Sequence, residues 1–460
     1  MKTGLAENNL LQFLPRTRRT LLRDLGRLAD RQGLSIYLVG GVVRDLLLRR
    51  TNWDLDITVE GDGLAFARMV ARRYRAGLAL FDRFATARLT FPDGIKLDIA
   101  STRRESYARP AALPDVETAS LNVDLYRRDF TINSMAIRLN ATQFGRFHDP
   151  YGGRRDLAAK TIRVLHSGSF RDDPTRIFRA IRFTERFGFH LEPVTRRLLE
   201  EAAATDVVGR LSGPRLCNEL LMLMNERDPD RSIRWLVRLK LLRFVHARLR
   251  HTRKCRHVVA GLARALIWWN AQIPNHPVDR PLIYLTALLS QSGPVVLHSV
   301  CRRLQLSSRE SSVLEWAGSK TDRLIYVLTG TKNVRPSQVF HLLADIPDDV
   351  LVLLVAKGFA KGKSEMTRRL TRRLSRFVRR DRDMTIRLNG DTLKRLGLAP
   401  GPQFRTILDA VLDARVDGVV QTASEECDLA SRLVKRWMKA TRHSGGSGLE
   451  LSAQRSSRGR

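Results

Sequence analysis

Two aspartates separated by one residue, Asp54 and Asp56, are candidates for binding a divalent cation. They lie in a stretch, residues 53–59, whose alternating character predicts a β-strand, and side chains at positions i and i+2 of a strand leave the same face. Carboxylate oxygens are the ligands that Mg²⁺ prefers, and an ion held there can bridge phosphates and activate a hydroxyl group. Asp98, on a later predicted strand, is a candidate third carboxylate. An edge strand that carries alternating acids for solubility is the alternative.

A glycine pair, Gly40 and Gly41, could approach a phosphate group. It follows a predicted buried strand over residues 35–39 and precedes a predicted helix over residues 42–49. Backbone amides without side chains can come close to an anion, and a helix N-terminus favours negative charge. Arg44, about one helical turn along, could reach the same anion. A tight strand-to-helix turn without a ligand is the alternative.

A basic segment farther on could bind a nucleotide's phosphates and ribose. Arg127 and Arg128 supply positive charge for a triphosphate, Asp129 can accept from a ribose hydroxyl group, and Asn133 can donate or accept. A solvated surface patch is the alternative for such a cluster.

Residues 172–176 could read the edge of a base. Asp173 and Arg176 lie three residues apart on one helical face, so a carboxylate and a guanidinium can point at the same group. Cytosine and adenine each present an amino donor beside a ring-nitrogen acceptor, whereas uracil and guanine present a carbonyl and a ring N–H. The pair would therefore select C and A without a template. Helix capping by Asp172-Asp173-Pro174 alone is the alternative.

The elements that must position these groups change in kind along the chain. Residues 33–140 alternate predicted helices and strands and include a hairpin over residues 87–100 with an Asp93-Gly94 turn. After about Asp149 strand signals almost vanish, and helical periodicity runs over residues 174–187, 195–204, 214–225 and 232–242. We predict an α/β head followed by an all-helical remainder. The predicted domains are an N-terminal helical segment (1–32), the head (33–148), a neck (149–228), a body (229–385), a tail (386–442) and a disordered basic end (443–460).

The composition points to a polyanionic partner. The 460 residues are 43% hydrophobic, which excludes wholesale disorder, and 81 Lys and Arg against 47 Asp and Glu give a net charge of +34. Nucleic acid is the first candidate partner. A helical basic stripe is predicted to bind RNA phosphates, with a solvated helix face as the alternative. Its members are Arg368, Arg369, Arg372, Arg373 and Arg376.

Four widely separated cysteines without a C-x-x-C pair favour a reducing compartment. No apolar leader opens the chain, and no apolar run is long enough to span a membrane. We expect a cytoplasmic protein that binds no membrane and has no obligate protein partner.

Four segments of the chain match known motifs in one order. They are LVGGVVRDLLL (38–48) followed by Asp54-Leu55-Asp56, then RRDFTINSMA (127–136), DPYGGRRDL (149–157), and DDPTR (172–176) with RAIRF (179–183). They resemble, in turn, the head, the ribose- and phosphate-binding motif, the head–neck hinge and the base-reading motif of class II tRNA nucleotidyltransferases and bacterial poly(A) polymerases, which have a polymerase-β-like fold. The family's base-reading motif usually begins with Glu, so Asp172 is a departure. Arg215 and Glu219 resemble a further neck motif, and residues 390–391 and 396–402 a C-terminal element of tRNA-directed members.

The resemblance implies a polymerase-β-like nucleotidyltransferase head followed by an all-α neck, body and tail. It implies a Mg²⁺-dependent enzyme that adds C and/or A from CTP and ATP to tRNA 3′ ends with release of pyrophosphate. A poly(A) polymerase and a non-catalytic RNA-binding protein are the alternatives. Residues 103–124, which include the family's flexible loop, do not distinguish CCA, CC or A addition by inspection.

Residue chemistry and the resemblance together define the predicted site. The catalytic residues are Asp54, Asp56 and Asp98, with Asp54 and Asp56 as metal ligands. The nucleotide-binding residues are Gly40, Gly41, Arg44, Arg127, Arg128, Asp129, Asn133, Asp172, Asp173, Arg176 and Arg179.

Overall fold

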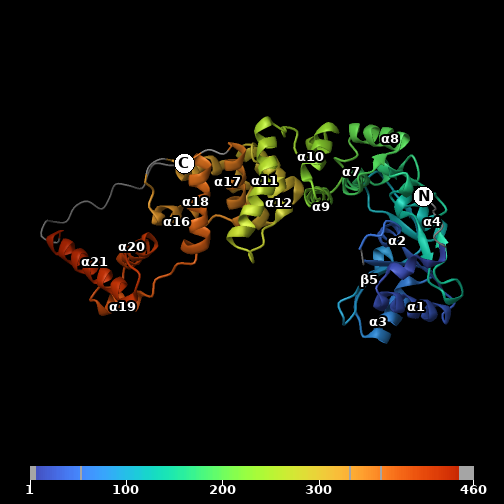
Figure 1. Cartoon of the computed structure of the whole chain (residues 1–460), viewed down its shortest axis with the longest axis horizontal. Coiled ribbons are helices and arrows are strands. Elements are labelled where there is room, and N and C mark those ends of the chain that lie inside the picture. Colours follow the sequence, from blue (N-terminus) through green and yellow to red (C-terminus); the bar gives the residue numbers. More distant parts are fainter. Residues whose placement is uncertain (1–6, 52–53, 331–332, 363–364, 445–460) are drawn as a thin grey trace. The chain divides into compact units, whose positions relative to one another are not determined.

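The computed structural model describes residues 7–51, 54–330, 333–362 and 365–444. They divide into two compact units, Met1–His251 with His298–Ser308, and Thr252–Leu297 with Arg309–Arg460. Figure 1 shows that the strands gather near the N-terminus, whereas helices make up the rest of the chain. The predicted fold class, an α/β head followed by helices, is confirmed.

The head is built on a seven-stranded mixed sheet with the order β3-β4-β5-β2-β1-β8-β9. Strands β2 and β5 run parallel, and every other neighbouring pair in this order is antiparallel. The predicted strand at residues 35–39 and the predicted hairpin are confirmed, as β1, β4 and β5. The strand bounds are β1 Ser35–Val39, β2 Leu55–Glu60, β3 Gly77–Phe81, β4 Thr86–Thr90, β5 Lys96–Ser101, β8 Ala136–Arg138 and β9 Phe147–His148.

Alternating side chains give the sheet one apolar face and one functional face. Ile57 and Ile99 join the main core on one face, which α1 (Arg16–Asp30) and α3 (Gly63–Tyr74) cover. Because side chains alternate along a strand, Asp56 lies on the other face. There α4 (Leu121–Tyr126) packs apolar side chains against β1.

Residues 103–118, whose structure the sequence patterns did not reveal, form a separate antiparallel pair. Strand β6 (Arg103–Ser106) pairs with β7 (Asp115–Thr118), apart from the main sheet. This hairpin brings charged side chains beside α4.

The helices that follow the head agree closely with the predicted segments. Residues 174–187, 195–204 and 214–225 correspond to α7, α8 and α9. Residues 232–242 instead break at Lys240, whose φ of 54° ends the helix, and continue as the 3₁₀ turn η5. The helix bounds are α2 Gly41–Leu47, α5 Gly153–Ala158, α6 Ser169–Asp172, α7 Thr175–Phe187, α8 Pro193–Ala204, α9 Gly213–Met224, α10 Pro229–Arg238 and η5 Leu241–Phe244. Two short strands, β10 (Thr161–Ile162) and β11 (His190–Leu191), pair in parallel.

From residue 252 onward the described chain is helical, with α17 buried along most of its length. The bounds are α11 Arg253–Gln272, α12 Arg280–Leu289, α13 Pro294–Leu304, α14 Ser308–Ser319, α15 Thr321–Thr329, α16 Pro336–Leu343, α17 Asp348–Ala360, α18 Glu365–Arg376, α19 Gly390–Arg395, α20 Gln403–Asp417 and α21 Ala423–Ser444. The predicted disordered end begins at His443, which still belongs to α21, and its residues 445–460 lie outside the described chain. Among the described residues, none of the helices has the length and apolar character needed to cross a membrane.

Candidate active site

The aspartate pair and the glycine turn meet at one point on the functional face of the sheet. Asp54 directly precedes β2 and is exposed, while Asp56 is the second residue of that strand and is half-buried. Gly40 has a φ of 77°, a conformation that L side chains rarely adopt. A Cβ atom there would lie 3.3 Å from Nη1 of Arg128 and 3.5 Å from Oδ2 of Asp56. The turn therefore leaves backbone, carboxylate and guanidinium side by side.

The environment of Asp56 favours an added positive charge. Burial raises the pKa of Asp56 to about 6, with smaller contributions from the Asp98 and Asp54 carboxylates, although Arg128 acts in the opposite direction. A bound cation would relieve both the burial cost and the repulsion between acids. Within the described ranges, no group of three or more His, Cys, Asp or Glu side chains could hold a metal ion. Asp54 and Asp56 would thus supply two ligands and leave the rest of an octahedral shell to water or substrate oxygens.

Asp98 lies beside this pair but has a partner of its own. Its Cα is in register with that of Asp56 across the parallel β2–β5 pair. Nε and Nη2 of Arg88 each donate to its carboxylate at 2.8 Å, which is a bidentate ion pair. The register that the sequence left open is now known, and a catalytic role for Asp98 stays a prediction.

We expect the buried charge of Asp56 to cost stability in the absence of a divalent cation. A carboxyl group whose folded-state pKa lies above its ordinary value of 3.8 stabilises the fold at low pH, and that contribution is lost as pH rises through about 6. Asp56→Asn should therefore raise the free energy of unfolding by up to about 3 kcal/mol at pH 7.5, and by less at pH 5. Denaturant unfolding in EDTA at both pH values checks this. Equal stability of the two proteins at pH 7.5 would contradict it.

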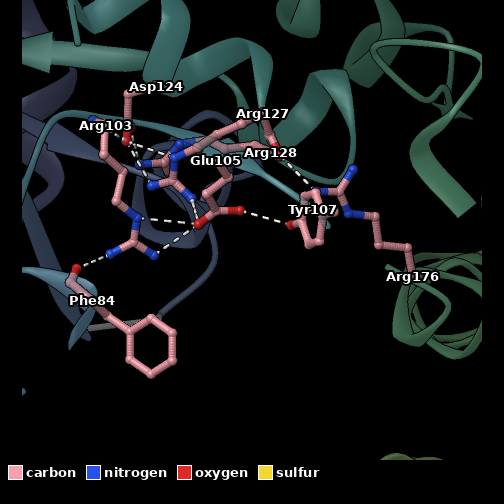
Figure 2. A network of polar contacts seen from close by, with 8 residues as sticks. All are labelled: Phe84, Arg103, Glu105, Tyr107, Asp124, Arg127, Arg128 and Arg176. Atoms are coloured by element: carbon pink, nitrogen blue, oxygen red, sulfur yellow. Dashed lines mark hydrogen bonds and ion pairs between the residues drawn. The ribbon is translucent and has the colours of Figure 1, made fainter. Parts of the chain in front are cut away.

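Arg127 and Arg128 share one buried acid but differ in what else they contact (Figure 2). Asp124, which is fully buried on α4, accepts from Arg127 at 2.6 Å and from Arg128 at 2.9 Å. Burial alone would raise the pKa of Asp124, but the two guanidinium groups outweigh it and lower that pKa. Arg127 also donates to Glu105 of β6 at 2.7 Å. Arg128 is thus the one placed beside Asp56, whereas two carboxylates hold the guanidinium of Arg127.

Sequence reasoning missed the acids of this network. Asp124 stands three and four residues before the two arginines, a helical spacing that could have revealed it. Glu105 carries no such signal, because it reaches Arg127 across 22 positions of the chain. Figure 2 shows Glu105 between Arg103 and Arg127, with the hydroxyl group of Tyr107 donating to its other oxygen at 2.9 Å.

Asp129 and Asn133, which are buried, form a chain of polar contacts with the half-buried Arg179. Nδ2 of Asn133 donates to Oδ1 of Asp129 at 2.9 Å, and Nη2 of Arg179 donates to Oδ2 at 2.6 Å. Burial opposes ionisation of Asp129, but Arg179 and Asn133 outweigh it and lower the pKa of its carboxyl group. Asp129 therefore joins the head to α7, and the predicted nucleotide-binding residues 129, 133 and 179 lie together.

Arg44 does not lie where the spacing suggested. Instead of facing the glycine turn, its Nη1 donates to Oδ1 of Asn133 at 2.6 Å and its Nε and Nη2 donate to Asp45. The guanidinium is buried, 4.7 Å from the ring centroid of Phe187. Asp45 and the ring of Phe187 hold the Arg44 side chain inside the protein. Arg44 therefore orients Asn133 by a hydrogen bond.

Asp173 and Arg176, the two candidates for reading the base, are each held in place by hydrogen bonds, and their partners differ. Oδ1 of Asp173 accepts from Thr175, which is the predicted capping role, and from Nη2 of Arg215 at 2.8 Å. Arg176 is buried and donates to Oγ of Ser169 at 2.7 Å and to the carbonyl of Arg127 at 2.6 Å. Arg215, one of the two residues that resemble a further neck motif, therefore pairs with Asp173. The carboxylate of Asp172 has a different neighbour, the ring of His166 at 3.9 Å.

The basic stripe on α18 divides into exposed and structural residues. Arg368 and Arg372 are exposed, and Arg368 pairs with Glu365 on its own helix. Arg373 instead donates to the carbonyl of Leu328 at the C-terminal end of α15, at 2.9 Å. Arg369 pairs with Glu365. Arg376 pairs with Asp381 and also donates to the carbonyl of Val416. Arg373 thus holds α18 to α15, and Arg376, although exposed, holds α18 to α20.

Comparison with known proteins identifies the family of the chain. The family model described as "Poly A polymerase head domain" matches residues 36–163, and that described as "Probable RNA and SrmB-binding site of polymerase A" matches residues 188–249. A solved apo form of a CCA-adding enzyme has a TM-score of 0.78 and 32% identity over 96% of this chain and all of that one. The CCA-adding enzyme of Thermotoga maritima in complex with tRNA has a TM-score of 0.73 and 31% identity, covering 94% and 99% of the two chains. The chain belongs to the tRNA nucleotidyltransferase and poly(A) polymerase family.

Curated relatives differ in the nucleotides that their names specify. The A-adding tRNA nucleotidyltransferase of Geobacter sulfurreducens is 40% identical over 92% of this chain and 48% of its own length. The CC-adding tRNA nucleotidyltransferase of Deinococcus radiodurans is 35% identical over 51% of this chain and 62% of its own length. The chain spans about half the length of the A-adding relatives it matches.

Proposed function

We propose that this protein adds A, C or both from ATP and CTP to the 3′ end of tRNA and releases pyrophosphate. The observation that carries the proposal is the meeting of Asp56, Arg128 and Gly40 on one face of the sheet, with Asp54 beside them. Related CCA-adding enzymes have been solved with CTP and with ATP, each at 31% identity to this chain. Addition of A is favoured over the other two specificities, because the A-adding relative from Geobacter is 40% identical to this chain, against 32% for the solved CCA-adding enzyme.

Asp54 and Asp56 would hold a divalent cation, and their hard oxygen ligands suit Mg²⁺. Such an ion would neutralise phosphate charge and lower the pKa of the attacking hydroxyl group. The 3′-hydroxyl oxygen of the RNA attacks the α-phosphorus, the bond to the bridging oxygen breaks, and pyrophosphate leaves. Arg128, beside Asp56, supplies positive charge for the triphosphate, and Gly40 lets the backbone come close to it. Asp129, the residue after Arg128, is held by a hydrogen bond from Arg179, and Asn133 is held by a hydrogen bond from Arg44.

Asp173 and Arg176 would select the incoming base. The carboxylate accepts from the exocyclic amino group of adenine or cytosine, and the guanidinium donates to the adjacent ring nitrogen. Arg215 restrains Asp173, and Ser169 with the carbonyl of Arg127 restrains Arg176. Because both groups are held before the nucleotide binds, little ordering cost remains for recognition.

One incorporation assay tests the proposal and separates its alternatives. Purified protein is given tRNA that ends before the first C, after one C or after CC, with labelled CTP or ATP in separate reactions. We expect one A on the CC-ending tRNA, and CTP incorporation on the shorter ones only if the enzyme also adds C. Long ATP-only products on unrelated RNA would favour a poly(A) polymerase. Binding of tRNA without incorporation would favour a non-catalytic RNA-binding protein.

We also propose that the protein is located in the cytoplasm, because its proposed substrate is tRNA. The four cysteines are widely separated in the sequence and include no C-x-x-C pair, which suits a reducing compartment. Fractionation of cells that express the full chain, with antibody detection, tests this location.

The exposed part of the α18 stripe should contribute to RNA binding through phosphate charge. We expect Arg372→Gln to weaken tRNA binding and to reduce the slope of log Kd against log salt by about 1, because one phosphate contact releases about one counterion. Arg373→Gln should instead lower the melting temperature, because Arg373 holds the carbonyl of Leu328. Filter binding at several salt concentrations and thermal unfolding of both variants measure these effects. An unchanged salt slope in Arg372→Gln would contradict the assignment of Arg372 to RNA.

A further inference from the structure

Three aromatic rings lie in succession at the junction of the head and the neck. The centroid of the Tyr126 ring is 5.5 Å from that of Tyr151 and 5.5 Å from that of His166. The interplanar angles are 49° and 35°, so Tyr126 is the middle ring of a tilted stack. The three residues come from different segments: the end of α4, the start of the hinge motif and the loop before α6.

The middle ring is exposed although its neighbours are anchored. Tyr126 keeps 44% of its surface open to solvent. Tyr151 packs against the apolar cluster of β1 and α4, and its hydroxyl group donates to the carbonyl of Asn122 at 2.8 Å. His166 is half-buried, and burial together with the nearby charge of Arg176 lowers its pKa, which keeps the imidazole ring neutral at neutral pH. The stack thus offers an uncharged aromatic surface whose outer rings are held in place.

The stack adjoins the base-reading side chains at two points. Nδ1 of His166 lies 3.9 Å from Oδ2 of Asp172, which directly precedes Asp173. Tyr126 directly precedes Arg127, whose carbonyl accepts from Arg176. The aromatic surface therefore lies beside the base-reading motif, and the RNA 3′ end must approach the nucleotide that this motif would bind for transfer to occur.

We propose that Tyr126, flanked by Tyr151 and His166, is a stacking platform for the unpaired bases at the 3′ end of the RNA acceptor. The proposal rests on the proposed function and adds the site that holds its acceptor substrate. Stacking on an aromatic ring tolerates any base, because every base has a π-face, and it suits an end whose sequence changes as nucleotides are added. Loss of one such ring should weaken binding of the RNA end by about tenfold.

The test uses a tRNA whose 3′-terminal base is 2-aminopurine, a fluorophore that is quenched when it stacks. Titration with the full chain, without any nucleotide, measures both quenching and affinity. We expect wild type and Tyr126→Phe to quench the probe equally, since both keep a ring. Tyr126→Ala should abolish most of the quenching and raise the KM for tRNA about tenfold, with the KM for ATP unchanged within twofold. Tyr326→Ala, which removes a ring that is 80% exposed on α15, is the matched control and should resemble wild type.

Three results would overturn the platform. The first is that Tyr126→Ala quenches the probe as fully as wild type does, and the second is that its KM for tRNA is unchanged. The third is that only its KM for ATP rises, which would assign the ring to the incoming base. If thermal unfolding shows that Tyr126→Ala is not folded, Tyr126→Leu, which keeps apolar bulk but has no ring, takes its place with the same expected changes. Failure of the proposed function would give a different result. A wild-type protein that quenches the probe but adds no nucleotide would support the stacking platform and contradict the proposed transferase activity.

Discussion

Asp56→Asn will lower the rate of nucleotide addition about a thousandfold or more, while the fold remains intact. The amide keeps the shape of the side chain but lacks the negative charge that a divalent cation requires, and a bound cation is worth several kcal/mol of transition-state stabilisation. Since the wild-type carboxylate is half-buried beside two other acids, which raises its pKa, the same substitution should stabilise the protein without cation. Loss of activity with gain of stability is the signature of a charged functional site.

The measurement is single-turnover incorporation of labelled ATP into CC-ending tRNA with saturating Mg²⁺. The matched control is Asp93→Asn, the same change in the exposed turn of the β4–β5 hairpin on the same sheet. We expect the control to retain wild-type activity within about threefold. An Asp56→Asn protein that keeps more than a tenth of wild-type activity would show that this carboxylate does not bind the essential cation.

Asp173→Asn will relax the choice of base by about a hundredfold. A buried or restrained carboxylate can only accept hydrogen bonds, so it rejects a base that presents a carbonyl, and sites built on such pairing discriminate strongly. Asparagine can accept through its oxygen or donate through its amide, and Arg215 and Thr175 can still bind its oxygen. We therefore expect UTP and GTP to become substrates while ATP addition slows.

The ratios of kcat/KM for ATP, CTP, UTP and GTP measure this change. Asp206→Asn is the matched control, because it makes the same change at an exposed acid between α8 and α9 that has no part in the site. It should alter the ratios by less than about threefold. Equal relaxation in the two variants would mean that overall charge, and not the placement of Asp173, selects the base.

Local patterns predicted much of the head, because burial there repeats with the period of each element. Strict alternation in β5 buries Leu97 and Ile99 and leaves Asp98 on the functional face. The same alternation predicted that Asp54 and Asp56 lie on one side, and in the structure Asp56 belongs to β2 whereas Asp54 directly precedes it. The helices of the neck were predictable for the same reason, since their apolar residues recur at helical spacing.

Other parts of the site depend on contacts between distant parts of the chain, which no local spacing encodes. Arg44 meets Asn133 across 89 positions, and Arg127 meets Glu105 across 22. In each case a long side chain that could have faced a ligand has a buried polar partner instead. The α18 stripe shows the same effect, because Arg372 and Arg373 are neighbours in sequence but only Arg373 holds the end of another helix.

A crystal of the protein with Mn²⁺ and a non-hydrolysable ATP analogue tests the central claim most directly. The anomalous signal of Mn²⁺ should lie about 2.1 Å from carboxylate oxygens of both Asp54 and Asp56, with the triphosphate beside Arg128. A well-occupied nucleotide with the ion elsewhere, or with no ion at these two acids, would contradict the account.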